Sequence, residues 1–181
     1  MQVFEPELWK SRAWDRFTRA VVAGRLKEEV ERVWFRDVVA VDDLTKLNEW
    51  CTSRKLKVVF VKKVGATYYP HDKEVLVSSR MSPQRQVVFL LHECGHHLIG
   101  MKDLAERYQL GYAEERPEVK RTFAHRLAVL EEEMEAWHRG WKLGQRLALA
   151  VERSYFDEVR YECLKSYIKW SVRPGKGAED Q

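Results

Sequence analysis

The stretch Ser82–Ile99, with the sequence SPQRQVVFLLHECGHHLI, decides how the rest of the chain is arranged. Ser82 places a capping hydroxyl directly before Pro83, and proline suits the first position of a helix because that position needs no N–H donor. An apolar run from Val87 to Leu91 follows, so the stretch predicts a helix over 84–99 that lies in the core. We expect the other elements to pack around it.

This helix carries the pattern His92-Glu93-Cys94-Gly95-His96. Two histidines four residues apart project from one face of a helix, so both imidazoles can bind one metal ion. The glutamate between them then stands beside the water position of a zinc ion, where it serves as a general base. The pattern predicts a zinc site with His92 and His96 as ligands and Glu93 as the catalytic base. The alternative is a buried hydrogen-bond network of the same three side chains without metal.

The remaining residues of the motif have simpler interpretations. Cys94 is a small core residue, and Gly95 allows another element to pack closely against the helix. His97 is rotated about 100° from His96 around the helix, so we expect it to support the structure rather than to bind the metal.

A catalytic zinc needs a third protein ligand, and the residues that follow His96 do not supply it. The metzincin pattern requires a glycine and then a histidine, but Ile99 and Lys102 occupy those positions. This excludes a compact three-histidine site. The remaining common solution is a glutamate from a later helix.

The segment Glu131–Glu135 offers that glutamate. Glu133 shares a helical face with Leu130 and Trp137 and therefore points into the core, whereas Glu131 and Glu135 lie on a polar face. A buried carboxylate needs a compensating charge, which a metal ion provides. We expect Glu133 to be the third ligand, with a buried salt bridge to an Arg or Lys as the explanation without metal. Two other ligands remain open alternatives, namely His125 and Glu132.

Hydrolysis of a peptide bond also needs a donor for the developing oxyanion. The sequence does not rank the candidates, which are Tyr68, Tyr69, His71, Tyr108 and Tyr112.

The remainder of the chain predicts an α+β fold that is mostly helical, with a small sheet of two or three strands packed on the metal-bearing helices. Helical spacing of apolar residues predicts two or three helices over 6–54, with Gly24 between the first two and Asp42-Asp43 as the cap of the last. Runs of β-branched and aromatic residues predict strands at 56–61, 65–70 and 74–77. Helical spacing returns over 119–151, and a capping box at Ser154–Asp157 predicts a final helix.

The length of 181 residues fits one domain. We expect that domain to span 1–172, with a helical extension at 1–40, a core at 41–140, C-terminal helices at 141–172 and a disordered tail at 173–181. The net charge of +4 is spread along the chain, so direct nucleic-acid binding is not expected. The three cysteines are widely spaced and indicate no disulfide framework, which fits the cytoplasm, and no stretch is apolar enough to span a membrane.

Five pieces of the chain resemble, in their order, the ImmA/IrrE family of zinc metallopeptidases. These pieces are a helix from about Val41, the strand Leu56–Val61, GATYYP at 65–70 leading to EVLV at 74–77, the His92–His96 motif, and EMEA at 133–136. The resemblance covers about 41–140 and implies a gluzincin-like site in which His92, His96 and Glu133 bind zinc and Glu93 is the base. It also implies a regulatory protease of the kind commonly encoded by phages and mobile elements, whose substrate is a DNA-binding repressor.

The chain departs from the pattern of that family in three respects. Trp137 stands where such proteins usually have Asn or Asp, which removes a polar group that would support a ligand. The interval between His96 and Glu133 is long, and the chain from Trp141 onward matches no part of the family.

The sequence therefore predicts a zinc-dependent metalloendopeptidase that hydrolyses peptide bonds of a specific protein substrate. The alternative is a catalytically weak zinc-binding interaction protein of a phage or mobile element that retains the peptidase fold. A third hypothesis is a helical adaptor without metal.

Overall fold

The computed structural model describes residues 26–62, 65–100, 108–120 and 122–172, with side chains from residue 37 onward. The elements follow the order α2 (Leu26–Ser53), β1 (Lys57–Val61), β2 (Ala66–Tyr69), β3 (Glu74–Ser78), α3 (Pro83–Gly100), α4 (Pro117–Lys120), α5 (Phe123–Arg146) and α6 (Arg153–Ser171). The predicted α+β class is confirmed, because helices dominate and the sheet is small. None of the described helices is long and apolar enough to cross a membrane. The predicted tail and most of the predicted N-terminal extension lie outside the described residues.

The sheet has three strands in the order β1-β3-β2. β1 runs parallel to the central strand β3, and β2 runs antiparallel to it, so the sheet is mixed. Val75 and Val77 of β3 are fully buried, and the strand thus contributes one apolar face to the core. All three predicted strands are present, each within two residues of its predicted bounds.

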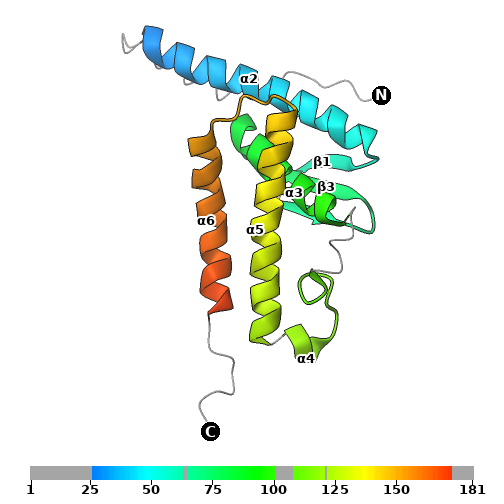
Figure 1. The fold of residues 1–181 in the computed structure, drawn as a ribbon. Helices are drawn as coiled ribbons and strands as arrows, with labels where there is room; N and C mark the ends of the chain where they lie inside the picture. The colour runs from blue at the N-terminus through cyan, green and yellow to red at the C-terminus, as the bar shows by residue number, and fades with distance from the viewer. Residues whose placement is uncertain (1–25, 63–64, 101–107, 121, 173–181) are drawn as a thin grey trace.

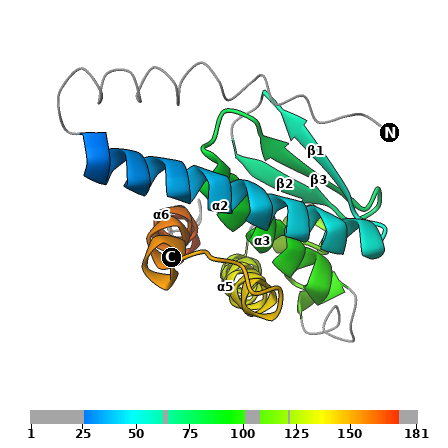
Figure 2. The ribbon, with the colours of Figure 1, turned by 90° about the horizontal axis from the view of Figure 1, so that it is seen from above.

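Helix α3 lies at the centre of the molecule, between the sheet and α5 (Figure 2). Four apolar residues of its first half are fully buried, as the apolar run of the sequence predicts: Val87, Val88, Leu90 and Leu91. The helix that carries the motif is therefore anchored by packing on several sides.

Helices α3 and α5 approach so closely that two glycines are needed at the crossing. A Cβ on Gly95 would lie 1.9 Å from the backbone oxygen of Ala136, and one on Gly140 would lie 2.5 Å from that of Leu91. Gly95 thus permits the close packing that the sequence predicts. This backbone contact fixes the distance between the motif on α3 and the glutamates on α5.

The prediction for the first helices needs correction. Residues 26–53 form one continuous helix, and Asp42 and Asp43 lie within it rather than at its start. Asp43 is only 2% exposed, and its carboxylate accepts hydrogen bonds from the backbone N–H of Ala150, at 3.0 and 3.1 Å. Figure 1 shows the reason, because α2 crosses the end of α5 and α6 at which their connection lies. Asp43 caps that connection instead of its own helix.

Two predictions in the C-terminal half are also wrong in detail. The helix predicted over 119–151 is divided into α4 and α5, because Thr122 caps α5 by accepting a hydrogen bond from the N–H of His125. Helix α6 begins at Arg153, and its N-cap Glu152 makes no side-chain cap bond, so the predicted capping box is absent. Asp157 instead accepts a 2.6 Å hydrogen bond from Nε of Arg153.

Candidate metal centre

The fold brings the three predicted ligands together. His92 and His96 project from α3 towards α5, where Glu133 points back at them. Nε2 of His92 lies 3.2 Å from Oε2 of Glu133, and Nε2 of His96 lies 3.3 Å from Oε1. One donor atom from each of the three side chains lies within 4.8 Å of the other two. A His-His-Glu cluster of this size can hold one metal ion.

The state of the Glu133 carboxylate supports that interpretation. The side chain is 2% exposed, and its Oε2 is buried with no hydrogen-bond partner in the part of the chain that the structure describes. Within the described part of the chain, no Arg or Lys forms an ion pair with it, so a salt bridge of the kind considered from sequence is not observed. Imidazole nitrogens and a carboxylate oxygen are donors that zinc and other divalent transition metals accept. The residues present therefore fit a metal ion.

Electrostatics favour the ionised form of this carboxylate. Burial alone would raise the pKa of Glu133, but the close imidazoles of His92 and His96, at 3.2 and 3.3 Å from its oxygens, and their charges hold it well below the usual range. For His96, burial lowers the pKa, whereas its hydrogen bond to Glu133 and the charges of nearby carboxylates raise it, and the result lies above the usual value. The site thus keeps a buried anion that attracts a cation.

Glu93 lies on the same helix, is 6% exposed, and faces strand β2. Burial raises its pKa, although the charges of His92 and His96 and the backbone N–H of Tyr68 act in the opposite direction. A carboxylate with a raised pKa is a stronger base, which is the property that a general base needs near neutral pH.

Trp137 takes the place of the polar residue found in the family that the sequence resembles. Its fully buried indole stacks on the ring of His92, with centroids 4.2 Å apart and an interplanar angle of 21°. Nδ1 of His92 is buried and has no hydrogen-bond partner among the described residues, whereas a metal-binding histidine usually donates its second N–H to a carboxylate or carbonyl. Aromatic packing therefore holds His92 where a hydrogen bond would otherwise do so.

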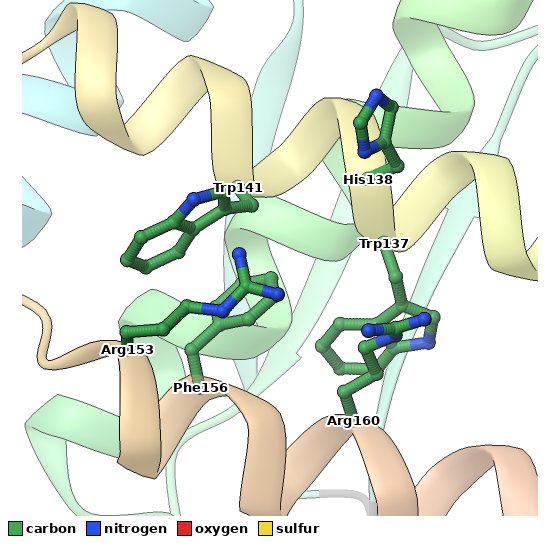
Figure 3. A pocket seen from close by; sticks show the side chains of 6 residues that line it. All are labelled: Trp137, His138, Trp141, Arg153, Phe156 and Arg160. Carbon is green, nitrogen blue, oxygen red and sulfur yellow. The ribbon is translucent and has the colours of Figure 1, made fainter.

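Trp137 also lines a pocket between α5 and α6 (Figure 3). The guanidinium of Arg153 lies 4.6 Å from the centroid of the Trp141 ring in this pocket. The pocket thus adjoins the metal centre through Trp137, which also stacks on His92. Its lining consists of Trp137, His138, Trp141, Arg153, Phe156 and Arg160.

The two alternative ligands lie elsewhere. Nδ1 of His125 donates a 2.6 Å hydrogen bond to the backbone oxygen of Leu110, and the imidazole is not in the cluster. Glu132 accepts a 3.0 Å hydrogen bond from the backbone N–H of Tyr112, and its Oε1 stands 3.9 Å from Nδ1 of His96. Glu132 therefore approaches the outer side of His96 rather than the space between the ligands.

The two remaining residues of the motif have packing roles. Nδ1 of His97 lies 2.9 Å from the hydroxyl of Tyr68, which agrees with the structural role predicted for this histidine. Cys94 is fully buried, and its Sγ lies 3.5 Å from that of Cys51. The two thiols join α3 to α2.

The structure also ranks the five candidate oxyanion donors. The hydroxyl of Tyr68 already contacts Nδ1 of His97. Tyr69 and His71 are exposed. Tyr108 lies in a small buried cluster with Ile99 and Ala136. The hydroxyl of Tyr112, in contrast, lies 2.5 Å from Oε1 of Glu133. Tyr112 is thus the candidate that reaches the centre.

Sequence reasoning missed one participant, Tyr167 of α6. Its hydroxyl lies 3.0 Å from that of Tyr112. Burial of the two hydroxyls and the charge of Glu133 raise the pKa of both tyrosines, so both remain hydrogen-bond donors at neutral pH. No local pattern marks Tyr167, because its spacing in α6 is that of an ordinary packed face.

The geometry of the centre therefore consists of two imidazoles and a carboxylate around one point, with a second carboxylate and two phenols beside them. Which metal it selects is a separate question, because several divalent ions accept this donor set.

The resemblance to the ImmA/IrrE family remains an expectation drawn from the sequence. Comparison of the chain with protein-family models, with curated proteins and with solved structures gives no significant match.

Proposed function

We propose that the protein is a zinc-dependent metalloendopeptidase. In this proposal His92, His96 and Glu133 bind zinc and Glu93 is the general base. The observation that carries it is the convergence of both Nε2 atoms on the buried carboxylate of Glu133, with Glu93 on the helix that supplies the two histidines. Two-histidine, one-glutamate sites of this kind leave one zinc position for water.

Zinc supplies Lewis acidity, which brings the pKa of a coordinated water to about 7 and polarises a peptide carbonyl. Glu93 accepts the proton of the attacking water as the new C–O bond forms. It then passes this proton to the leaving nitrogen as the peptide C–N bond breaks, and it returns to its ionised form. The raised pKa of Glu93 suits both steps, because the group must hold the proton between them.

Strand β2 supports a peptide as the substrate. It stands at the end of the strand order, so in the described part of the molecule one of its edges is unpaired. The backbone N–H of Tyr68 in this strand faces Glu93. An extended peptide that adds to this edge as a further strand would pass beside the catalytic base.

The substrate class follows from the resemblance to the ImmA/IrrE family. We propose a specific intracellular protein as the substrate, such as a DNA-binding repressor of a phage or mobile element. A narrow specificity agrees with the burial of Glu93, which is 6% exposed.

The same burial favours the second candidate, a zinc-binding interaction protein with weak catalysis. His92, Glu93 and Glu133 are each no more than 7% exposed, which restricts access to the centre. In this case, zinc stabilises the fold and another surface binds the partner. The two candidates differ in whether the zinc-loaded protein hydrolyses peptide bonds at an appreciable rate.

Removal of the metal tests the proposed function. The zinc-loaded protein, the protein stripped with a chelator and the stripped protein with zinc restored are incubated with a mixture of denatured proteins, and new amino termini are identified by mass spectrometry. We expect new termini in the first and third samples and none in the second, because the attacking water is activated only when zinc is present. Equal cleavage in all three samples, or none in any of them, would count against a metallopeptidase.

A further inference from the structure

Two tyrosines from distant parts of the chain meet at the Glu133 carboxylate. Tyr112 belongs to the segment before α4, and its hydroxyl lies 2.5 Å from Oε1 of Glu133. Tyr167 belongs to α6, and its hydroxyl lies 3.0 Å from that of Tyr112. The contact therefore joins α6 to a residue that the metal cluster contains.

The hydrogen atoms available fix the direction of these bonds. Each phenol has one hydrogen, and the ionised carboxylate of Glu133 can only accept. The hydrogen of Tyr112 is therefore directed at Oε1, which agrees with the short distance of a charge-assisted bond. Because Tyr112 has no second hydrogen to donate, Tyr167 must be the donor in the 3.0 Å contact between the two hydroxyls. The result is a chain of donors from Tyr167 through Tyr112 to Glu133, in which each bond strengthens the next.

This chain distinguishes the two oxygens of Glu133. Oε1 accepts the bond from Tyr112, whereas Oε2 is buried without a hydrogen-bond partner and stands 3.2 Å from Nε2 of His92. A carboxylate held at one oxygen cannot turn freely about its terminal bond. Oε2 is thereby kept facing His92, while Oε1 stays within 3.3 Å of Nε2 of His96.

Tyr112 is itself held in place by the residue next to the ligand. Its backbone N–H donates a 3.0 Å hydrogen bond to Oε2 of Glu132. Gly111 permits this approach, because a Cβ at this position would lie 2.4 Å from the same oxygen. Glu132 therefore binds the backbone of Tyr112 while Glu133 accepts its hydroxyl, so both ends of the tyrosine are fixed to α5.

We propose that Tyr112 and Tyr167 are positioning residues that orient Glu133 as a metal ligand, which makes α6 a part of the metal centre. This inference rests on the metal binding that the proposed function requires. It does not depend on peptide hydrolysis. The α6 residue lies outside the stretch of about 41–140 on which the family resemblance rests. Groups that hydrogen-bond to metal ligands typically change metal affinity by about 10- to 100-fold when removed.

The test is the zinc affinity of Tyr112→Phe and Tyr167→Phe, measured by competition with a chromophoric chelator. Tyr161→Phe is the matched control, because it makes the same change on α6 at a side chain that is 64% exposed. We expect Tyr112→Phe to bind zinc about 10- to 100-fold more weakly, Tyr167→Phe to show a smaller loss, and Tyr161→Phe to bind as the wild type does. Tyr167 acts on Glu133 through Tyr112 and also interacts with that carboxylate itself, so the double variant should bind at least as weakly as Tyr112→Phe.

Two further readouts separate positioning from a general structural role. Thermal melting of the metal-free variants establishes that each is folded when its affinity is measured. The visible absorption of the cobalt-substituted protein reports the geometry of the ligands, and it should change in Tyr112→Phe but not in Tyr161→Phe. Unchanged affinity and spectrum in Tyr112→Phe would overturn the inference, even if hydrolysis fell, because the hydroxyl would then act on the substrate. Wild-type protein that binds no zinc would overturn the proposed function and this inference together.

Discussion

Replacing Glu93 with Gln should lower the rate of peptide hydrolysis by about 10²- to 10⁴-fold, the range typical of a lost general base. The amide has nearly the same shape as the carboxylate but cannot accept the proton of the attacking water. Zinc content should stay the same, because Glu93 is not one of the three clustered ligands. The measurement is the rate of cleavage at saturating substrate, with the metal content of the same samples.

Glu131→Gln is the control for this prediction. It makes the same chemical change on α5 at an exposed side chain, and both its activity and its zinc content should match the wild type. The Glu93 variant should also melt at the same temperature as the wild type or higher, because it removes a carboxylate that is 6% exposed. Hydrolysis that persists in Glu93→Gln would assign the proton transfer to another group.

Gly95→Ala should destabilise the protein by at least about 1–3 kcal/mol, the range typical of an overpacked core. Its Cβ would lie 1.9 Å from the oxygen and 2.7 Å from the carbonyl carbon of Ala136. These are backbone atoms of α5, so the clash cannot be relieved by a side-chain rotation. The helices must separate, and this moves the histidines of α3 away from Glu133. We therefore expect lower thermal stability together with a loss of bound zinc.

Gly100→Ala provides the comparison within the same helix. Among the residues that the structure describes, a Cβ at Gly100 would meet nothing within 4 Å, so this change should be neutral or stabilise the helix by up to about 1 kcal/mol. The measurements are thermal unfolding and zinc content for both variants. If Gly95→Ala were as stable as Gly100→Ala, the close crossing of α3 and α5 would be wrong.

The features that sequence predicts best depend on neighbouring residues. The Ser82-Pro83 start of α3 and its apolar run are local signals, and the helix is present where they place it. The short strands also follow local composition. Glu133 was selected from four glutamates by its helical face alone, and it is the one whose carboxylate forms a cluster with both histidines. Periodicity therefore carries information about a contact between two helices when one face is clearly apolar.

The features that sequence misses depend on contacts between distant residues. Asp43 looks like the cap of a helix, but its carboxylate accepts from the backbone N–H of Ala150, which the fold places beside it. Asp157 has the spacing of a capping box, yet its carboxylate accepts a hydrogen bond from Arg153 at the start of α6. Tyr167 reaches Tyr112 only because α6 packs against α5. No single segment of sequence contains these pairs.

The exchange of a polar residue for Trp137 is a fourth example. In the sequence it is only a departure from the family pattern, which predicts a weaker hold on a ligand. In the structure the indole stacks on His92 and is packed by Phe156, at a centroid distance of 5.4 Å. Packing across three elements thus replaces a local hydrogen bond.

The claim that His92, His96 and Glu133 bind one metal ion is tested most directly by elemental analysis of the purified protein without added zinc. Wild type, Glu133→Ala and the exposed control Glu131→Ala are purified in parallel, and their folding is checked by circular dichroism. We expect about one equivalent of zinc in wild type and in Glu131→Ala, and little in Glu133→Ala. Folded wild type without metal, or Glu133→Ala with a full equivalent, would contradict the metal centre described for this protein.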